Sequence, residues 1–299
     1  MRTLAVPALA LGLAALAGCR MNVDTQAFIE RDEKRFTTAG PVDLDLNTLD
    51  GSIELRSWDR PEVLVEIEKR GQDKEAVDRI TVTAAQKGNA VTVDVQHNGR
   101  TTVIGIGHFI STSARLIVTA PRSANVTART GDGSIVLERI DGRVDLRTGD
   151  GSIKVVEAKG DVLAESGDGT LTLDDVSGRV EARTDDGSVR VSGTPGMLRV
   201  RTGDGTVSLR IRNGASMTDD WTIDSGDGSI TVELPSGFNA MIDADPGSDG
   251  RVRNDLDLSN VSGPGAEKRE RGSLTGQLGT GGKRLTLRTG DGTIRLTRY

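Results

Sequence analysis

The sequence predicts an all-β fold: a β-solenoid of 18-residue coils with two short strands each, preceded by a smaller β-rich N-terminal region. Between residues 129 and 209 the phrase Arg-Thr-Gly-Asp-Gly-Ser-Ile occurs five times in close variants, and a second glycine accompanies each copy. Two turns that stay in phase through every unit indicate that each unit is one coil of a stacked array. The aspartates of the phrase follow at steps of 18 residues: Asp132, Asp150, Asp168, Asp186 and Asp204. The second glycines keep the same step: Gly142, Gly160, Gly178, Gly196 and Gly214.

Apolar and polar residues alternate between the two turns of each unit, as at Ile135 and Leu137 and again at Val144 and Leu146. This alternation is typical of a strand with one buried side. Such short strands bury their apolar side only against neighbours, so we expect parallel coils stacked at a step of about 4.8 Å. Stacking places equivalent residues in columns, and one column consists of hydroxyl side chains: Ser134, Ser152, Thr170, Ser188 and Thr206.

Residues 1–18 are typical of a lipoprotein signal peptide. Their apolar run is too short for a good membrane-spanning helix, and Leu16-Ala17-Gly18-Cys19 resembles the bacterial lipobox. Cys19 is the only cysteine, which argues for acylation, as with palmitate, and leaves no disulfide framework. The resemblance implies a mature chain attached through Cys19 to an envelope membrane, facing the periplasm or the exterior. Arg20 favours the outer membrane if the cell has two membranes. The alternative is an ordinary secretory peptide.

The rest of the chain divides into three regions. Residues 19–35 are polar and charged after the cysteine, and we expect them to form a tether between the lipid and the fold. Residues 36–121 are predicted to form the N-terminal β region, with a short helix near 73–80. Residues 122–299 are predicted to form the solenoid repeat region, and the polar, Gly-rich stretch at about 259–283 is expected to be a flexible loop.

A series of short motifs extends along the chain in a fixed order. They are Gly51-Ser52-Ile53, Ser57-Trp58-Asp59, the strand Val63–Ile67, Leu116–Pro121 before the first Gly-Asp-Gly turn, the repeats, and Glu233-Leu234-Pro235. Together these motifs resemble the bacterial DUF4097 family, whose members are proposed adhesins. The resemblance covers about residues 36–299. It implies a β-strand-repeat protein of the cell envelope without established catalytic residues.

Composition argues against several functions. The formal net charge is −6 and aromatic residues make up 2% of the chain, so neither a basic nucleic-acid surface nor a stacking platform is predicted. His97 and His108 are the only histidines, which leaves too few ligands for a His/Cys metal site and no arrangement for nucleophilic catalysis. We therefore expect no catalytic residues, no nucleic-acid partner and no small-molecule substrate.

The aspartate row is the candidate metal site. In stacked coils Asp132, Asp150, Asp168, Asp186 and Asp204 lie about 5 Å apart, and carboxylates this close repel one another or share a cation. Calcium is one interpretation, although the Gly-Gly-x-Gly-x-Asp pattern of calcium rolls is absent. The favoured interpretation is that the aspartates cap turn amides, with arginines forming alternating charged rows beside them. These arginines are Arg129, Arg147, Arg183, Arg201 and Arg288.

These observations predict a lipid-anchored bacterial envelope protein that is not an enzyme. Its repetitive surface is expected to serve adhesion or binding, with an envelope glycan or protein as partner, or to act as a structural spacer. The alternatives are a calcium-stabilised solenoid and an enzyme that acts on envelope polysaccharide through solenoid carboxylates. Such an enzyme needs two acids in distinct environments, whereas the repeated acids of this chain are equivalent.

Overall fold

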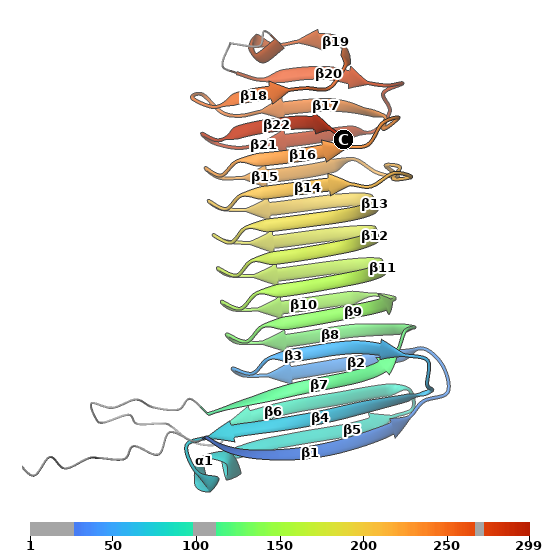
Figure 1. The fold of residues 1–299 in the computed structure, drawn as a ribbon, viewed down its shortest axis with the longest axis vertical. Helices are drawn as coiled ribbons and strands as arrows, with labels where there is room; N and C mark the ends of the chain where they lie inside the picture. The colour runs from blue at the N-terminus through green and yellow to red at the C-terminus, as the bar shows by residue number, and fades with distance from the viewer. Residues whose placement is uncertain (1–26, 98–111, 267–271) are drawn as a thin grey trace, which may run out of the picture.

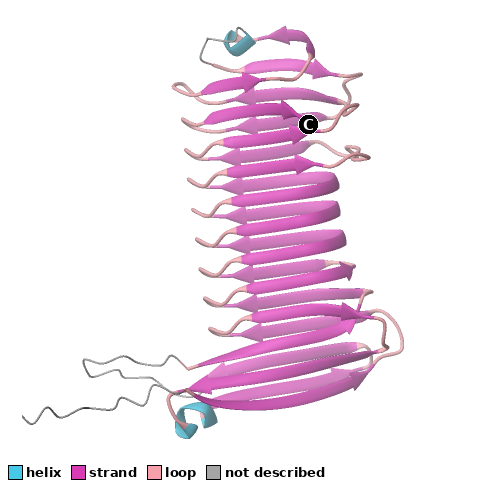
Figure 2. Cartoon of the chain, in the orientation of Figure 1, coloured by secondary structure: helices cyan, strands magenta, loops and turns pink. Residues whose placement is uncertain are grey.

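The predicted all-β solenoid is confirmed. A computed structural model describes residues 27–97, 112–266 and 272–299. These residues form a tall stack of strands (Figure 1, Figure 2), and the 22 strands belong to one hydrogen-bonded system. The helical elements within these ranges are α1 (Lys74–Asp78) and the 3-10 helix η1 (Pro264–Ala266). Neither described helix has the length and apolar character needed to cross a bilayer.

Each regular coil contributes one strand to each of two opposite faces, which we call face A and face B. Face A contains, in spatial order, β6 (Ala90–His97), β2 (Val42–Thr48), β8 (Ala124–Thr130), β10 (Val144–Thr148), the second halves of the three long strands, β15 (Trp221–Ser225), β21 (Arg284–Arg288) and β17 (Ala240–Asp245). Face B contains β7 (Ser113–Pro121), β3 (Ile53–Trp58), β9 (Ile135–Asp141), the first halves of the long strands, β14 (Val207–Ile211), β16 (Ile230–Leu234), β22 (Thr293–Arg298) and β18 (Arg251–Asn254). The long strands, which bend from face B into face A, are β11 (Ile153–Ser166), β12 (Leu171–Thr184) and β13 (Val189–Thr202).

Parallel pairing keeps the predicted 18-residue register. Ile135, Ile153 and Leu171 are paired in series on face B, for example. Their side chains point inward with those of the other alternating Val, Ile, Leu and Ala residues and form one core between the two faces. Trp221 belongs to this core: its ring is fully buried, and its Nε1 donates a hydrogen bond to the Gly196 carbonyl at 3.0 Å.

The first coil of the described chain does not lie at the end of the stack. β2 pairs in parallel with both β6 and β8, and β3 pairs in parallel with both β7 and β9. The coil of residues 42–58 therefore lies between strands β6 and β7 on one side and the coil of residues 124–141 on the other. The boundary predicted at 121–122 needs correction, because the early repeat phrase at residues 50–53 already belongs to the solenoid.

The last coil is interleaved in the same way. β21 pairs in parallel with both β15 and β17, and β22 pairs in parallel with both β16 and β18. The coil of residues 284–298 thus lies between the coils of residues 221–234 and 240–254. The coils of residues 42–58 and 284–298 therefore each pair with a coil on both sides, and at least one of these neighbours is not the next coil in the sequence.

Antiparallel strands close both ends of the stack (Figure 1). At the N-terminal end, β4 (Glu62–Gly71) pairs with β7 and β1 (Phe28–Thr37) pairs with β4, while β5 (Ile80–Lys87) pairs with β6. At the other end, β20 (Leu274–Leu278) pairs with β17, and β19 (Leu258–Ser262) pairs with β20. Such caps matter because an open strand edge is a template for association with another chain.

Two further predictions need correction, and one is confirmed. Residues 28–35, expected to form part of the tether, lie in β1, whose alternation is masked by charged residues on an edge strand. The predicted flexible loop at about 259–283 contains most of β19, all of η1 and all of β20. The short helix near 73–80 is α1, and Asp73 caps it by accepting a hydrogen bond from the Ala76 amide at 2.8 Å.

Candidate binding surfaces of the two faces

The aspartate row lies on the turns that lead from face A to face B. Asp132, Asp150, Asp168, Asp186 and Asp204 are exposed there, one in each successive coil. The predicted capping role is wrong, since within the described chain these carboxylates accept no hydrogen bond from turn amides. No group of three or more His, Cys, Asp or Glu residues among the described residues is placed to hold a metal ion. Calcium binding by the row stays a prediction.

The turns are capped instead by a buried row of hydroxyls, each two residues before an aspartate. Thr148 is typical: its Oγ1 accepts a hydrogen bond from the Gly151 amide at 3.2 Å and donates to the Gly133 carbonyl of the preceding coil at 2.8 Å. The hydroxyls that accept a hydrogen bond from their own turn in this way, and so join it to the neighbouring turn, are those of Thr148, Ser166, Thr184 and Ser225. Thr130, Thr202 and Thr289 donate to a carbonyl of the neighbouring turn. This capping row consists of Thr130, Thr148, Ser166, Thr184, Thr202, Ser225 and Thr289.

The predicted hydroxyl column lies at the edge of face B and is confirmed by the backbone. The Ile135 amide donates to the Ser152 carbonyl at 3.0 Å, and the Ile153 amide donates to the Thr170 carbonyl at 3.1 Å. The same bond recurs at Ser188 and Thr206. The side-chain hydroxyls of this column, which are exposed or half-buried, form no hydrogen bond with any other part of the described chain. They are therefore available to solvent or to a ligand.

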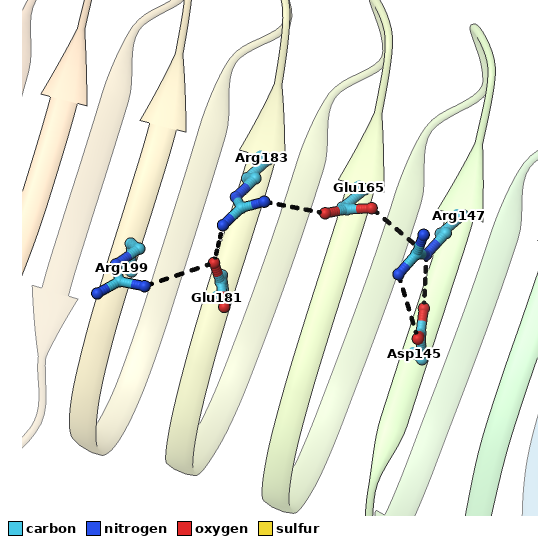
Figure 3. Close-up of polar contacts among 6 residues, drawn as sticks. All are labelled: Asp145, Arg147, Glu165, Glu181, Arg183 and Arg199. Carbon is cyan, nitrogen blue, oxygen red and sulfur yellow. Dashed lines mark hydrogen bonds and ion pairs between the residues drawn. The ribbon is translucent and has the colours of Figure 1, made fainter.

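A charge ladder crosses the outer side of face A (Figure 3). Glu165 is shared by two arginines, at 3.3 Å from Arg147 Nε and at 3.5 Å from Arg183 Nη1. Arg147 Nε also lies 2.9 Å from Asp145 Oδ1, and this hydrogen bond raises the pKa of Arg147. The ladder continues from Arg183 to Glu181 and ends at Arg199, whose Nη1 lies 3.9 Å from Glu181. The predicted alternating charges thus exist at Arg147 and Arg183, but these arginines pair with acids of the strands and not with the aspartate row. Arg129 lies 3.8 Å from Asp45, whereas Arg201 and Arg288 form no ion pair with another described residue.

Face B carries a different column of charges, which we call the basic column. Parallel pairing places seven residues in it, four cations and three hydroxyl residues without an acid. They are, in spatial order, Lys154, Thr172, Arg190, Ser208, Thr231, Arg295 and Arg253. All four cations are exposed, and none forms an ion pair with another described residue.

A shallow depression of about 540 Å³ follows the basic column across five coils, from Lys154 to Thr231. Two acids also line it, and both are already paired. Asp174 lies 2.9 Å from Arg212 Nη2 and accepts a hydrogen bond from the Ser192 hydroxyl, while Glu233 lies 3.5 Å from Arg210 Nε. The unpaired charge in this depression is therefore positive.

Several other residues singled out in the sequence lie apart from these surfaces. Cys19 and His108 fall outside the described residues, and His97 ends β6. A second hollow, of about 570 Å³, lies among the loops that follow β14, β16 and β20. The five-residue insertion before Trp221 signals this hollow in the sequence. Asn239, which lines this hollow, already has a partner within the chain: its Oδ1 accepts a hydrogen bond from the Thr280 amide at 2.8 Å.

Most of the chain matches one family of proteins. The family model described as Toastrack DUF4097 matches residues 42–297. The chain belongs to the Toastrack family. The matched region of the Toastrack chain begins at the first residue of β2 and ends within β22, so it includes both interleaved coils. The resemblance drawn from the short motifs is confirmed. A comparison with curated protein sequences finds no match.

Two solved structures are similar to this Toastrack chain. One is a proposed cell adhesion protein from Clostridium sporogenes, 15% identical, with 91% of this chain and 100% of that chain covered and a TM-score of 0.29. The other is a proposed adhesin from Bacteroides fragilis, 12% identical, with 89% and 97% covered and a TM-score of 0.36. Similarity at this level carries no argument about what the Toastrack chain binds.

Proposed function

We propose that this Toastrack protein is a lipid-anchored bacterial envelope protein that is not an enzyme and uses the outer surface of its solenoid for adhesion or binding. The observation that carries the proposal is the register of the stack, which holds outward polar side chains in straight columns. A partner with a repeating structure meets outward polar side chains at a regular step of about 4.8 Å along such a column.

The position of Cys19 supports the anchored arrangement. β1 begins at Phe28, nine residues after the cysteine, and nine residues of chain span at most about 30 Å. The lipid would therefore lie near the start of β1, at the end of the stack that is capped by β1, β4 and β5. Acylation is tested by growing cells with labelled palmitate, which should enter the wild-type chain and not the Cys19→Ser chain. Equal labelling of both chains would contradict anchoring at Cys19.

Binding is tested by co-sedimentation of the Cys19→Ser chain with separated envelope fractions, with calcium or with a chelator. We expect saturable binding to one fraction in both conditions. Binding only with calcium would support the alternative of a calcium-stabilised surface. Sedimentation with no fraction under either condition would contradict the binding function and leave a structural spacer as the remaining interpretation.

A further inference from the structure

We propose that the basic column of face B binds a linear polysaccharide that carries acidic groups, laid along the axis of the stack. The proposal rests on the binding function above and adds the class of ligand and the surface that holds it. It follows from the pairing of charges on the two faces, from the shape of face B and from the position of the aspartate row.

The basic column brings together cations that no described acid contacts, in a column without an acid. On face A the unpaired Arg143 and Arg179 have Asp161 in the coil between them. On face A, a ligand must displace acids that Arg147 and Arg183 already contact. On face B, Lys154 and Arg190 exchange only water and counterions for the ligand, because no described acid contacts them. Complementary charge of this kind favours encounter and orientation of the partner.

The geometry of the surface favours an extended ligand. Lys154 and Arg190 lie two coils apart, about 9.6 Å, and the column from Lys154 to Arg253 extends over about 29 Å at the strand step. The depression beside the column runs across five coils in the same direction. Hydroxyls of Thr172 and Ser208 alternate with the cations, and the hydroxyl column lies beside them on face B. Such a surface offers repeated hydrogen bonds to sugar hydroxyls as well as ion pairs to acidic groups.

The aspartate row fixes the orientation of this ligand. The row lies at the turn edge, two residues before the hydroxyl column and four before the basic column, as in Asp150, Ser152 and Lys154. Exposed carboxylates repel an anionic polymer over about 10 Å at ordinary ionic strength. The acidic groups of the polysaccharide should therefore lie over the basic column, and its neutral hydroxyl side should lie toward the turn.

Other extended polyanions fit this surface less well. The chain has 2% aromatic residues and an overall negative charge, so it lacks the stacking groups that single-stranded nucleic acids use. An acidic peptide in extended form points alternate side chains to opposite sides, so half of its carboxylates face away from the column. Strand addition needs a free edge, whereas the strands of face B from β3 to β22 are paired on both sides.

The test is titration of the Cys19→Ser chain with polygalacturonate, with its fully methyl-esterified form as the uncharged comparison. The double variant Lys154→Gln/Arg190→Gln should bind polygalacturonate about threefold to tenfold more weakly, as expected for the loss of two exposed ion pairs. The matched control is Arg143→Gln/Arg179→Gln, which removes two exposed, unpaired cations spaced two coils apart on face A. The control should bind like the parent chain, and the esterified polymer should not bind.

Three results would overturn the proposal: equal loss of binding in both double variants, undiminished binding of the esterified polymer, or equally tight binding of polyglutamate with the same dependence on Lys154 and Arg190. Asp150→Asn/Asp168→Asn should strengthen polygalacturonate binding, and weaker binding would contradict the assigned orientation. The envelope fractions separate this inference from the proposed function. If the parent chain and Lys154→Gln/Arg190→Gln sediment equally with a fraction, the ligand surface is wrong and the binding function stands.

Discussion

Faces A and B are built from the same repeat but arrange their charges differently. On face A, Glu165 lies between Arg147 and Arg183, and the ladder extends in both directions through further acids and bases. On face B, Lys154 and Arg190 share their column with hydroxyl residues and have no described partner. The backbone register is the same on both faces, so the difference comes from the outward side chains alone.

The residues that hold the coils of the solenoid together are thus different from those that form its outer surface. Inward residues, turn glycines and the capping row hold the coils in place, while outward positions are free to differ between faces. Exposed ion pairs contribute about 0–1 kcal/mol each, so the ladder adds little to stability. Unpaired cations about 9.6 Å apart repel one another weakly, because this separation is close to the screening length of about 10 Å. We therefore expect the basic column to contribute little to stability, as the proposed binding role allows.

The largest loss of stability is expected from a substitution that disrupts the stacked turns, which both faces share. A Cβ at Gly151 would lie 2.0 Å from the Gly133 carbonyl oxygen, which no side-chain movement relieves. Gly151→Ala should lower the free energy of unfolding by about 3 kcal/mol or more, measured by urea denaturation. Gly40→Ala is the control, because a Cβ there meets only the Asn89 side chain at 3.3 Å. Equal stability of the two variants would contradict the tight turn stacking.

An intermediate effect is expected from the two rows of hydroxyls. Thr148→Val removes the buried hydroxyl that bonds Gly133 and Gly151 and leaves both groups without that partner. It should cost about 1–3 kcal/mol, whereas Ser152→Ala, in the exposed hydroxyl column, should change the stability by less than about 0.5 kcal/mol. Denaturant midpoints of the two variants measure the difference. A larger loss for Ser152→Ala would reverse the roles assigned to the rows.

The smallest effect concerns the charges themselves. Glu165→Gln removes two contacts of the ladder and should lower the free energy of unfolding by about 0.5 kcal/mol, with the loss disappearing at high salt. Lys154→Gln should leave stability unchanged or raise it slightly, because no ion pair is lost. Matched denaturation curves at low and high salt test both variants. A greater loss for Lys154→Gln would show that this lysine has a structural partner.

The sequence predicts the regular coils well because their information is local. The 18-residue step, the alternation at Ile135 and Leu137 and the exposed hydroxyl column all follow from spacing along the chain. The cap of α1 by Asp73 is local too. The sequence predicts the wrong side chain for the capping role, because aspartate and threonine both favour turns and spacing does not show which of them points inward.

The ends of the stack were not predictable in the same way. Every coil presents nearly the same edge, so the sequence does not show that residues 42–58 pair with two other coils far along the chain. The sequence does not indicate β1, because this edge strand carries charged residues such as Arg31 and Glu33 and has no clear apolar pattern. The turn from face B to face A also has a conformation that the sequence does not indicate. Arg139, Glu157 and Asp175 adopt φ values of 56–59° there, in the left-handed region where glycine is usual.

The most direct test of the difference between the faces is arginine modification with phenylglyoxal, read by peptide mass spectrometry with and without polygalacturonate. Arg190 is exposed and unpaired on face B, and Arg143 and Arg179 are exposed and unpaired on face A. We predict that the polymer slows modification of Arg190 and leaves the rates at Arg143 and Arg179 unchanged. Equal protection at all three arginines, or protection confined to face A, would contradict the assignment of binding to face B.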